Sequence, residues 1–359
     1  MSFPESGKLC RLLILAADFL ISKDEGLCIS AIQDAAGRSP EKGRGKRVFS
    51  ILHFQHALMS ERINLVKEFS LRTISIRANL SLFPAFLREM TDTQLEAHAG
   101  SDTETPLRAS DYPMTGLVLL SVPAWEPSHL RQSLLLDWQI NAGEPPQTPH
   151  EPWIFRVNGS LVVVGLEPRP VPDHAADEQA KNCHDWPEAA DVAHAHQAYL
   201  AVAVIAESAS LIENARTAMK VLASLCEQPN ARAVNAASRL FAPDVYRKAA
   251  LAMQDSEKAF PIFNLIYFGL WQQNDVEGLS GYTVGLDRFG VREVEIQGSL
   301  LKPLEIRALM VDAAMMQITR GKTFAEGEEV KLGGRTYRAL IAASAALPIP
   351  ETTHLVPMP

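Results

Sequence analysis

The sequence predicts an α+β fold with two ferredoxin-like halves, residues 114–207 and 208–359, each with an antiparallel sheet and packed helices. A poorly defined N-terminal extension, residues 1–113, precedes them. From residue 114 onwards, short apolar strands alternate with amphipathic helices. Over residues 115–206 these elements follow the β-α-β-β-α-β order of the ferredoxin-like arrangement. Residues 281–321 then indicate two antiparallel strands and a long helix, the most specific pattern in the chain.

In the first half, Asn158-Gly159 predicts a hairpin, because both residues tolerate the positive φ of a type I′ turn. The predicted elements are a strand at 115–122, a helix at 128–138, hairpin strands at 153–157 and 161–167, a helical region from 175, and a strand at 196–206. The second half continues with a helix that Ser210 and Glu213 open as a capping box. It is followed by a strand at 231–237, a helix at 243–253, an aromatic strand at 261–273, hairpin strands at 328–332 and 336–344, and a proline-rich surface tail at 348–359.

Within residues 281–321, the predicted strands are 282–286 and 291–297, joined by a turn at 287–290. Pro303 fits the first turn of a helix and Gly321 its C-terminal stop. Strand alternation places Glu293 and Glu295 on one face.

The N-terminal extension differs from the rest of the chain in its pattern of apolar, basic and turn-forming residues. Residues 10–20 and 48–69 have the periodicity of amphipathic helices. The glycine-rich basic run at 37–47 is interpreted as a linker rather than a nucleic-acid tether, because it holds no aromatic residue for base stacking. Residues 96–113 are polar and turn-rich, typical of a further linker.

Composition limits the function classes. The 47% hydrophobic content suffices for sizeable cores, and four widely spaced cysteines without a C-x-x-C pair suit a reducing compartment without a disulfide framework or zinc motif. The apolar run at 12–21 is too short to span a bilayer and is interrupted by Asp18. Because Glu5 precedes this run, it is also a poor signal peptide. We therefore expect a cytoplasmic protein that does not enter a membrane.

The net charge of −8 is unevenly distributed. Residues 1–113 hold 14 basic and 14 acidic side chains, whereas residues 114–359 hold 20 and 28. An acidic protein is not expected to bind nucleic acid in general. The pattern instead predicts a protein partner of basic character, for example a basic toxin.

Glu293 and Glu295 are one candidate for chemistry. Their carboxylates would lie on the order of 7 Å apart on a strand, which could serve acid and base roles in glycoside hydrolysis. The commoner explanation is the solvent-facing side of an antiparallel sheet, and we favour it here.

His194 and His196 are the second candidate. On a strand, residues two apart project to the same face, so the pair could share a metal with help from nearby carboxylates. The alternative is a hydrogen-bonded histidine at a strand entrance, which we favour because no third ligand is fixed by spacing.

Other motifs carry no recognised chemistry. The glycines at 278–285 precede a strand, whereas a phosphate-binding loop follows a strand and opens a helix. No serine or cysteine has a recognisable nucleophile context. The sequence predicts no cofactor and favours a non-enzymatic role.

Three segments carry a resemblance. They comprise Gly116-Leu-Val-Leu-Leu-Ser121 with Asp137-Trp138, then Pro170-x-Pro172, Asn182, Trp186-Pro-Glu-Ala189 and His196-Gln-Ala-Tyr-Leu200, and finally Thr283-x-Gly285-Leu286, Phe289-Gly290 and Glu293-x-Glu295. Together they resemble the bacterial family called domain of unknown function 4261, over about residues 114–357. Cys183 and His184 depart from the family's more hydrophobic pair. The candidate functional surface comprises Trp186, His194, His196, Thr283, Gly285, Glu293 and Glu295.

The resemblance implies no established activity. Its members are similar to cytoplasmic accessory proteins, some encoded near type VI secretion or toxin loci, so an immunity-like role is expected by analogy. The resemblance covers none of residues 1–113, which are either a lineage-specific extension or sequence upstream of a true start at Met114; we favour the second. The leading hypothesis is a non-enzymatic, protein-binding accessory protein. The alternative is a metal-dependent enzyme that uses His194 and His196.

Overall fold

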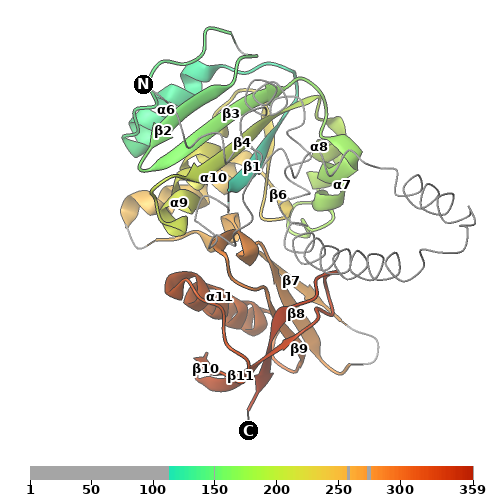
Figure 1. Cartoon of the computed structure of the whole chain (residues 1–359). Helices are drawn as coiled ribbons and strands as arrows, with labels where there is room; N and C mark the ends of the chain where they lie inside the picture. The colour runs from blue at the N-terminus through green and yellow to red at the C-terminus, as the bar shows by residue number, and fades with distance from the viewer. Residues whose placement is uncertain (1–112, 149, 257–258, 273–275, 359) are drawn as a thin grey trace, which may run out of the picture. The chain divides into compact units, whose positions relative to one another are not determined.

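The computed structural model describes residues 113–148, 150–256, 259–272 and 276–358. Internal contacts divide the chain into two units, Met1–His98 and Ala99–Pro359, and the described residues all belong to the second. The helices and linkers expected over residues 1–112 lie outside the described residues, so the extension and the alternative start at Met114 stay predictions. The described part has the α+β fold that the sequence predicts, and it contains two six-stranded sheets (Figure 1).

The first sheet, sheet A, is antiparallel and has the strand order β2-β3-β4-β1-β5-β6. Its strands are β1 (Met114–Leu120), β2 (Trp153–Val157), β3 (Ser160–Glu167), β4 (Ala198–Ala206), β5 (Ala231–Ala236) and β6 (Arg239–Phe241). The predicted hairpin at Asn158-Gly159 is confirmed, with φ of 51° and 75° at the two turn residues.

Helices cover sheet A in two groups. They are α6 (Pro127–Trp138), α7 (Ala175–Ala180), α8 (Ala189–Ala195), α9 (Leu211–Leu225) and α10 (Pro243–Asp255), and a 3₁₀ turn, η3 (Pro172–His174), precedes α7. Helix α9 packs on β1 and β4, with α6 and α10 against it. A Cβ at Gly116 of β1 would lie 2.7 Å from Leu222 of α9, so the missing side chain permits this close packing. Helices α7 and α8 instead lie beside β6 and β5 (Figure 1).

The strand order differs from the ferredoxin-like one. There, the first strand pairs with both the third and the fourth; here β1 pairs with β4 and β5, while β3 pairs with β4. Because β5 and β6 join the far side of β1, sheet A extends beyond the predicted boundary at residues 207 and 208. The change of sheet falls after α10.

The second sheet, sheet B, has the order β10-β11-β12-β9-β8-β7, and β12 and β9 are parallel. Its strands are β7 (Tyr267–Trp271), β8 (Leu279–Val284), β9 (Val294–Ser299), β10 (Glu329–Leu332), β11 (Arg335–Ala342) and β12 (Thr352–Pro357). Helix α11 (Pro303–Arg320) packs against β8 and β9 and ends at Gly321 in the left-handed conformation, as predicted. Figure 1 shows α11 beside this sheet.

Two predictions in this half are wrong. The proline-rich tail does not lie along the surface, because residues 352–357 form β12 between β11 and β9, where Thr352, Thr353 and Leu355 are buried. The aromatic strand expected at 261–273 is confined to β7, since a 3₁₀ turn, η4 (Ile262–Asn264), precedes it.

The two sheets share one apolar core in the described residues, which includes Tyr246 and Met253 of α10 and Leu265 and Ile266 before β7. The Asn264 side-chain amide donates to the Tyr246 carbonyl over 3.1 Å. None of the helices within the described ranges combines the length and apolar character needed to cross a bilayer.

Candidate functional site

His194 and His196 do not form the predicted pair on a strand. His194 lies in the last turn of α8 and is exposed, whereas His196 is the buried residue that ends this helix. Strand β4 begins only at Ala198, so the alternation that would align the two rings does not apply.

Both ring nitrogens of His196 have backbone partners. The Nε2 atom accepts the Val171 N–H over 2.8 Å, and the Nδ1 atom contacts the Ala193 carbonyl. His196 therefore fixes the segment before α7 to the end of α8. Among the described residues, no group of three or more His, Cys, Asp or Glu side chains is arranged to hold a metal ion. The metal interpretation loses its geometric basis, and the hydrogen-bonded histidine is what the structure shows.

A pocket opens beside His196, with a volume of about 280 Å³. It lies between the end of β1, helix α8 and the start of β5. Its lining residues are Ser121, Asp191, Val192, Ala195, His196 and Arg232. Asp191 and Arg232 are both exposed, and neither side chain makes a hydrogen bond or ion pair within the described part of the chain.

Trp186 is half-buried in the turn between α7 and α8. Its N–H donates to the Cys183 carbonyl over 3.1 Å, and its carbonyl accepts the Ala189 N–H over 3.1 Å. The Cys183 thiol accepts the Leu240 N–H of β6 over 3.2 Å, and burial raises the pKa of this thiol. Cys183, which differs from the more hydrophobic residue of the resembled family, therefore fixes the α7–α8 connection to β6 through its thiol. Because its pKa is raised, this thiol is not a reactive nucleophile.

Two further contacts hold the same turn. The Asn182 amide donates to the Ser238 carbonyl over 2.8 Å, and Arg239 forms an ion pair with Asp185. Desolvation raises the pKa of Asp185, but its hydrogen bond and ion pair with Arg239 outweigh that effect and hold the pKa below its usual value. The chain at residues 182–185 is therefore fixed by β5–β6.

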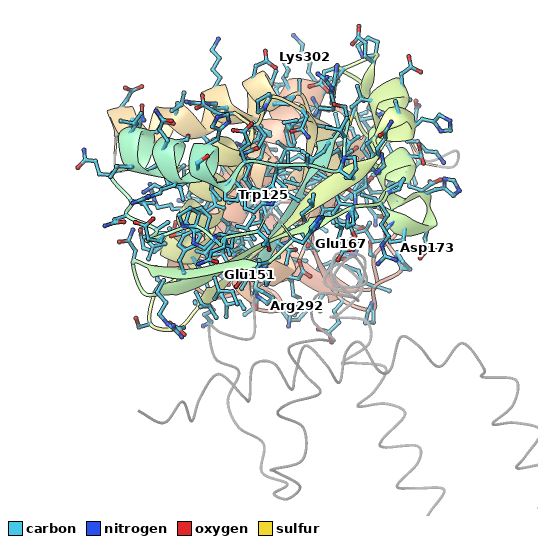
Figure 2. All side chains as sticks on the ribbon, turned by 90° about the horizontal axis from the view of Figure 1, so that it is seen from above. Trp125, Glu151, Glu167, Asp173, Arg292 and Lys302 are labelled. Atoms are coloured by element: carbon cyan, nitrogen blue, oxygen red, sulfur yellow. The ribbon has the colours of Figure 1, made fainter. Side chains whose placement is uncertain are left out.

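Acidic side chains concentrate on this segment. What we call the α7–α8 acidic surface comprises Asp173, Asp177, Glu178, Asp185, Glu188 and Asp191. Lys181 is the one lysine or arginine between residues 173 and 191, and it pairs with Glu178 over 2.7 Å. Asp173 projects from the edge of the described part, beside these helices (Figure 2).

A second group of candidate residues lies at sheet B and is distant in sequence from His194 and His196. It comprises Thr283, Gly285 and Glu293. The Glu293 carboxylate accepts hydrogen bonds from the Thr283 hydroxyl over 2.7 Å, the Gly285 N–H over 2.7 Å and the Leu286 N–H over 2.9 Å. Gly285 has a φ of 115°, and a Cβ there would lie 2.9 Å from the Leu265 carbonyl oxygen, so the turn requires glycine.

Burial and a nearby charged side chain shift the pKa of the Glu293 carboxyl group. Burial and the nearby Asp287 carboxylate raise the pKa of Glu293 to about 7, although its three hydrogen-bond donors favour the ionised form. Asp287 and Arg288 lie in a 3₁₀ turn, η5 (Leu286–Phe289), and burial raises the pKa of Asp287 and lowers that of Arg288. The Oδ1 atom of Asp287 and the hydroxyl of Tyr246 are buried without a hydrogen-bond partner in the described structure.

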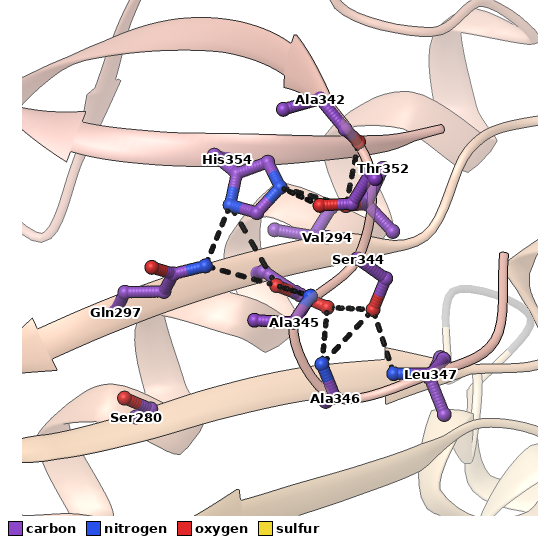
Figure 3. Close-up of polar contacts among 12 residues, drawn as sticks. Ser280, Val294, Gln297, Ala342, Ser344, Ala345, Ala346, Leu347, Thr352 and His354 are labelled. Atoms are coloured by element: carbon purple, nitrogen blue, oxygen red, sulfur yellow. Dashed lines mark hydrogen bonds and ion pairs between the residues drawn. The ribbon is translucent and has the colours of Figure 1, made fainter. Parts of the chain in front are cut away.

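Glu295 is also buried, so the expectation that both glutamates face solvent is wrong. It pairs in register with Tyr282 of β8 and His354 of β12. The loop after β11 folds over its carboxylate, which accepts bonds from the Ser344 hydroxyl, the Ala345 N–H over 3.1 Å and the Ala346 N–H over 3.3 Å (Figure 3). Glu293 and Glu295 thus hold two different loops, and each carboxylate is buried against its own hydrogen-bond donors.

The grouping of Ser344, His354 and Glu295 is not a nucleophile triad. Ser344 donates to Glu295 rather than to His354, and the His354 Nδ1 lies 3.6 Å from Glu295. The other ring nitrogen lies 3.0 Å from the Thr352 hydroxyl and 3.1 Å from the Ala343 carbonyl. A triad requires the base to contact the nucleophile, so these residues hold the loop between β11 and β12.

Sequence reasoning missed Arg239, Asp287, Arg288 and His354. Only the adjacent charges of Asp287 and Arg288, placed in a turn between apolar strands, offered a signal before the structure. Comparisons of the chain with protein-family models, with curated proteins and with solved structures gave no match.

Proposed function

We propose that this protein is a cytoplasmic bacterial accessory protein that binds a basic protein partner through the α7–α8 acidic surface. The observation that carries the proposal is the density of carboxylates on that surface, which holds six between residues 173 and 191 against one lysine. Opposite charge on a partner would accelerate encounter and orient docking.

The absence of intramolecular partners for three of these carboxylates in the described residues supports this proposal. The side-chain carboxylates of Asp173, Glu188 and Asp191 have no hydrogen-bond or ion-pair partner within the described residues, so their charges are available to a second molecule. Trp186 lies in the same segment and is half-buried. Tryptophan is enriched at the anchoring positions of protein interfaces.

Rigidity of the segment also supports it. Asn182, Cys183 and Asp185 are each bonded to residues 238–240, and His196 holds the far end. A surface whose backbone is fixed in advance loses less conformational entropy on binding.

The immunity-like role follows from analogy. If the resemblance to the domain of unknown function 4261 holds, the partner is a basic toxin from a type VI secretion or related locus. The alternative, a metal-dependent enzyme, would require His196 to give up its bonds with Val171 and Ala193.

The test uses the full chain as bait in extracts of the cells that encode it, at low salt. One variant neutralises the surface through Asp173→Asn, Glu178→Gln and Glu188→Gln. A matched control removes three exposed carboxylates elsewhere through Asp244→Asn, Asp255→Asn and Asp312→Asn. We expect one stoichiometric basic protein to be retained by the unchanged chain and the control, and lost from the neutralised variant. Equal retention by all three would contradict the proposal.

A further inference from the structure

The pocket beside α8 combines Asp191, which also belongs to the α7–α8 acidic surface, with Arg232, a charge that the protein-binding proposal does not use. Asp191 and Arg232 line the same cavity of about 280 Å³, and neither has an ionic partner in the described structure. We propose that this pocket binds a small zwitterion, an α-amino acid, with its ammonium on Asp191 and its carboxylate on Arg232.

The two charges select the ligand class. A ligand with only a positive charge would be attracted by Asp191 and repelled by Arg232, and a ligand with only a negative charge would meet the reverse. A zwitterion satisfies both. Arginine is suited to the carboxylate end, since its planar guanidinium can donate two parallel hydrogen bonds to one carboxylate.

The remaining lining fits the rest of such a ligand. Val192 and Ala195 of α8 give an apolar wall for an aliphatic side chain. His196 has both nitrogens committed to the backbone, so its ring is a fixed wall rather than a hydrogen-bonding group. The Ser121 hydroxyl has only a long bond of 3.4 Å to the Asn230 carbonyl and can turn to the ligand.

The volume limits ligand size. Pockets for drug-sized ligands begin at about 300 Å³, so a cavity just below that range suits a free amino acid rather than a peptide or nucleotide. The site is open to solvent on one side and carries exposed charges, so we expect modest affinity, with Kd on the order of 0.1–1 mM.

Isothermal titration of the full chain with the common amino acids tests the proposal, with acetate and methylammonium as probes that carry one charge each. Asp191→Asn and Arg232→Gln each remove one recognition group. Asp244→Asn and Lys248→Gln are the matched controls, because these exposed charges lie on α10 outside the pocket.

We expect at least one amino acid to bind saturably, and both pocket variants to weaken it about tenfold or more, while the controls leave it unchanged. Acetate and methylammonium should bind far more weakly than the amino acid. Absence of saturable binding by every amino acid, or equal binding by the pocket variants, would overturn the proposal. The variant that tests the protein partner leaves Asp191 and Arg232 intact, so the two proposals fail separately.

Discussion

The hydroxyl of Thr283 donates a hydrogen bond to the Glu293 carboxylate over 2.7 Å and accepts one from the Val294 N–H over 2.8 Å. One side chain of β8 therefore fixes both the start of β9 and the carboxylate that holds the turn at Gly285 and Leu286. The Thr-x-Gly segment and the first glutamate of the Glu-x-Glu pattern have a structural explanation here, since Thr283, Gly285 and Glu293 form one buried hydrogen-bond network. Glu295 instead holds the loop after β11.

Replacing Thr283 by Val should destabilise the protein by about 1–3 kcal/mol, because the Val294 N–H would be left buried without its acceptor. Thr283→Ser keeps the hydroxyl and should recover most of this loss. Urea unfolding followed by circular dichroism measures both. A Val variant as stable as the Ser variant would show that the hydroxyl contributes nothing.

Stability should fall as the pH rises from about 4.5 to 7, owing to Glu293. The folded-state pKa of Glu293, about 7, lies above its ordinary value of 4.5. The folded state therefore holds the proton more tightly, so the contribution is fully present below pH 4.5 and is lost as the pH approaches 7. The buried groups that act on this carboxyl are Asp287 and Arg288.

Glu293→Gln removes this titration and keeps an amide oxygen for the Gly285 and Leu286 N–H groups. We expect its free energy of unfolding to depend less on pH than that of the unchanged chain over this interval. The difference should be on the order of a few kcal/mol. Identical pH profiles would show that Glu293 titrates normally.

Glu295→Gln should loosen the loop between β11 and β12. The Oε2 atom accepts the Ala345 N–H over 3.1 Å, and an amide group there would oppose one donor with another. We expect faster hydrogen exchange across residues 343–350, by about tenfold for a loss near 1.4 kcal/mol. The control is Glu351→Gln, which removes an exposed partner of Arg292 from the same loop. Faster exchange in the control alone would contradict the role given to Glu295.

His196→Ala should destabilise the protein by about 1–3 kcal/mol, because the buried Val171 N–H loses its acceptor. His194→Ala should change the free energy of unfolding by less than about 0.5 kcal/mol, since this side chain is exposed. Thermal unfolding of the two variants distinguishes a structural His196 from a shared metal site, for which both substitutions would abolish zinc-dependent stabilisation equally.

The sequence predicts elements whose signals are local. Helix α11 was expected from Pro303 to Gly321 because proline at the first turn and glycine after the last are both short-range signals. The Asn158-Gly159 hairpin is a further example. The order of the strands was not predictable in this way, because the pairing of β1 with β5 joins residues far apart in the chain.

The burial of Glu293 and Glu295 was not predicted, because it too depends on contacts with other segments of the chain. Strand alternation grouped Glu293 with Glu295, and their charge alone suggested solvent exposure, but both side chains are buried. Loop N–H groups around Gly285 and Ala345 hydrogen-bond both carboxylates and so allow their burial. Strand β12 (Thr352–Pro357) was missed for a similar reason. Two prolines precede it and suggested a surface tail, and its parallel pairing with β9 joins residues far apart in the chain, so no short-range pattern predicts it.

The most direct test of the proposed function is the association rate of the purified partner with the full chain at low and high ionic strength. If the α7–α8 acidic surface attracts a basic protein, the rate should fall by about tenfold or more between low and high salt. The variant with Asp173→Asn, Glu178→Gln and Glu188→Gln should show a slower rate and a weaker salt dependence, and the Asp244, Asp255 and Asp312 control should behave like the unchanged chain. A rate that is independent of salt, or equally salt-dependent in the neutralised variant, would contradict binding through this surface.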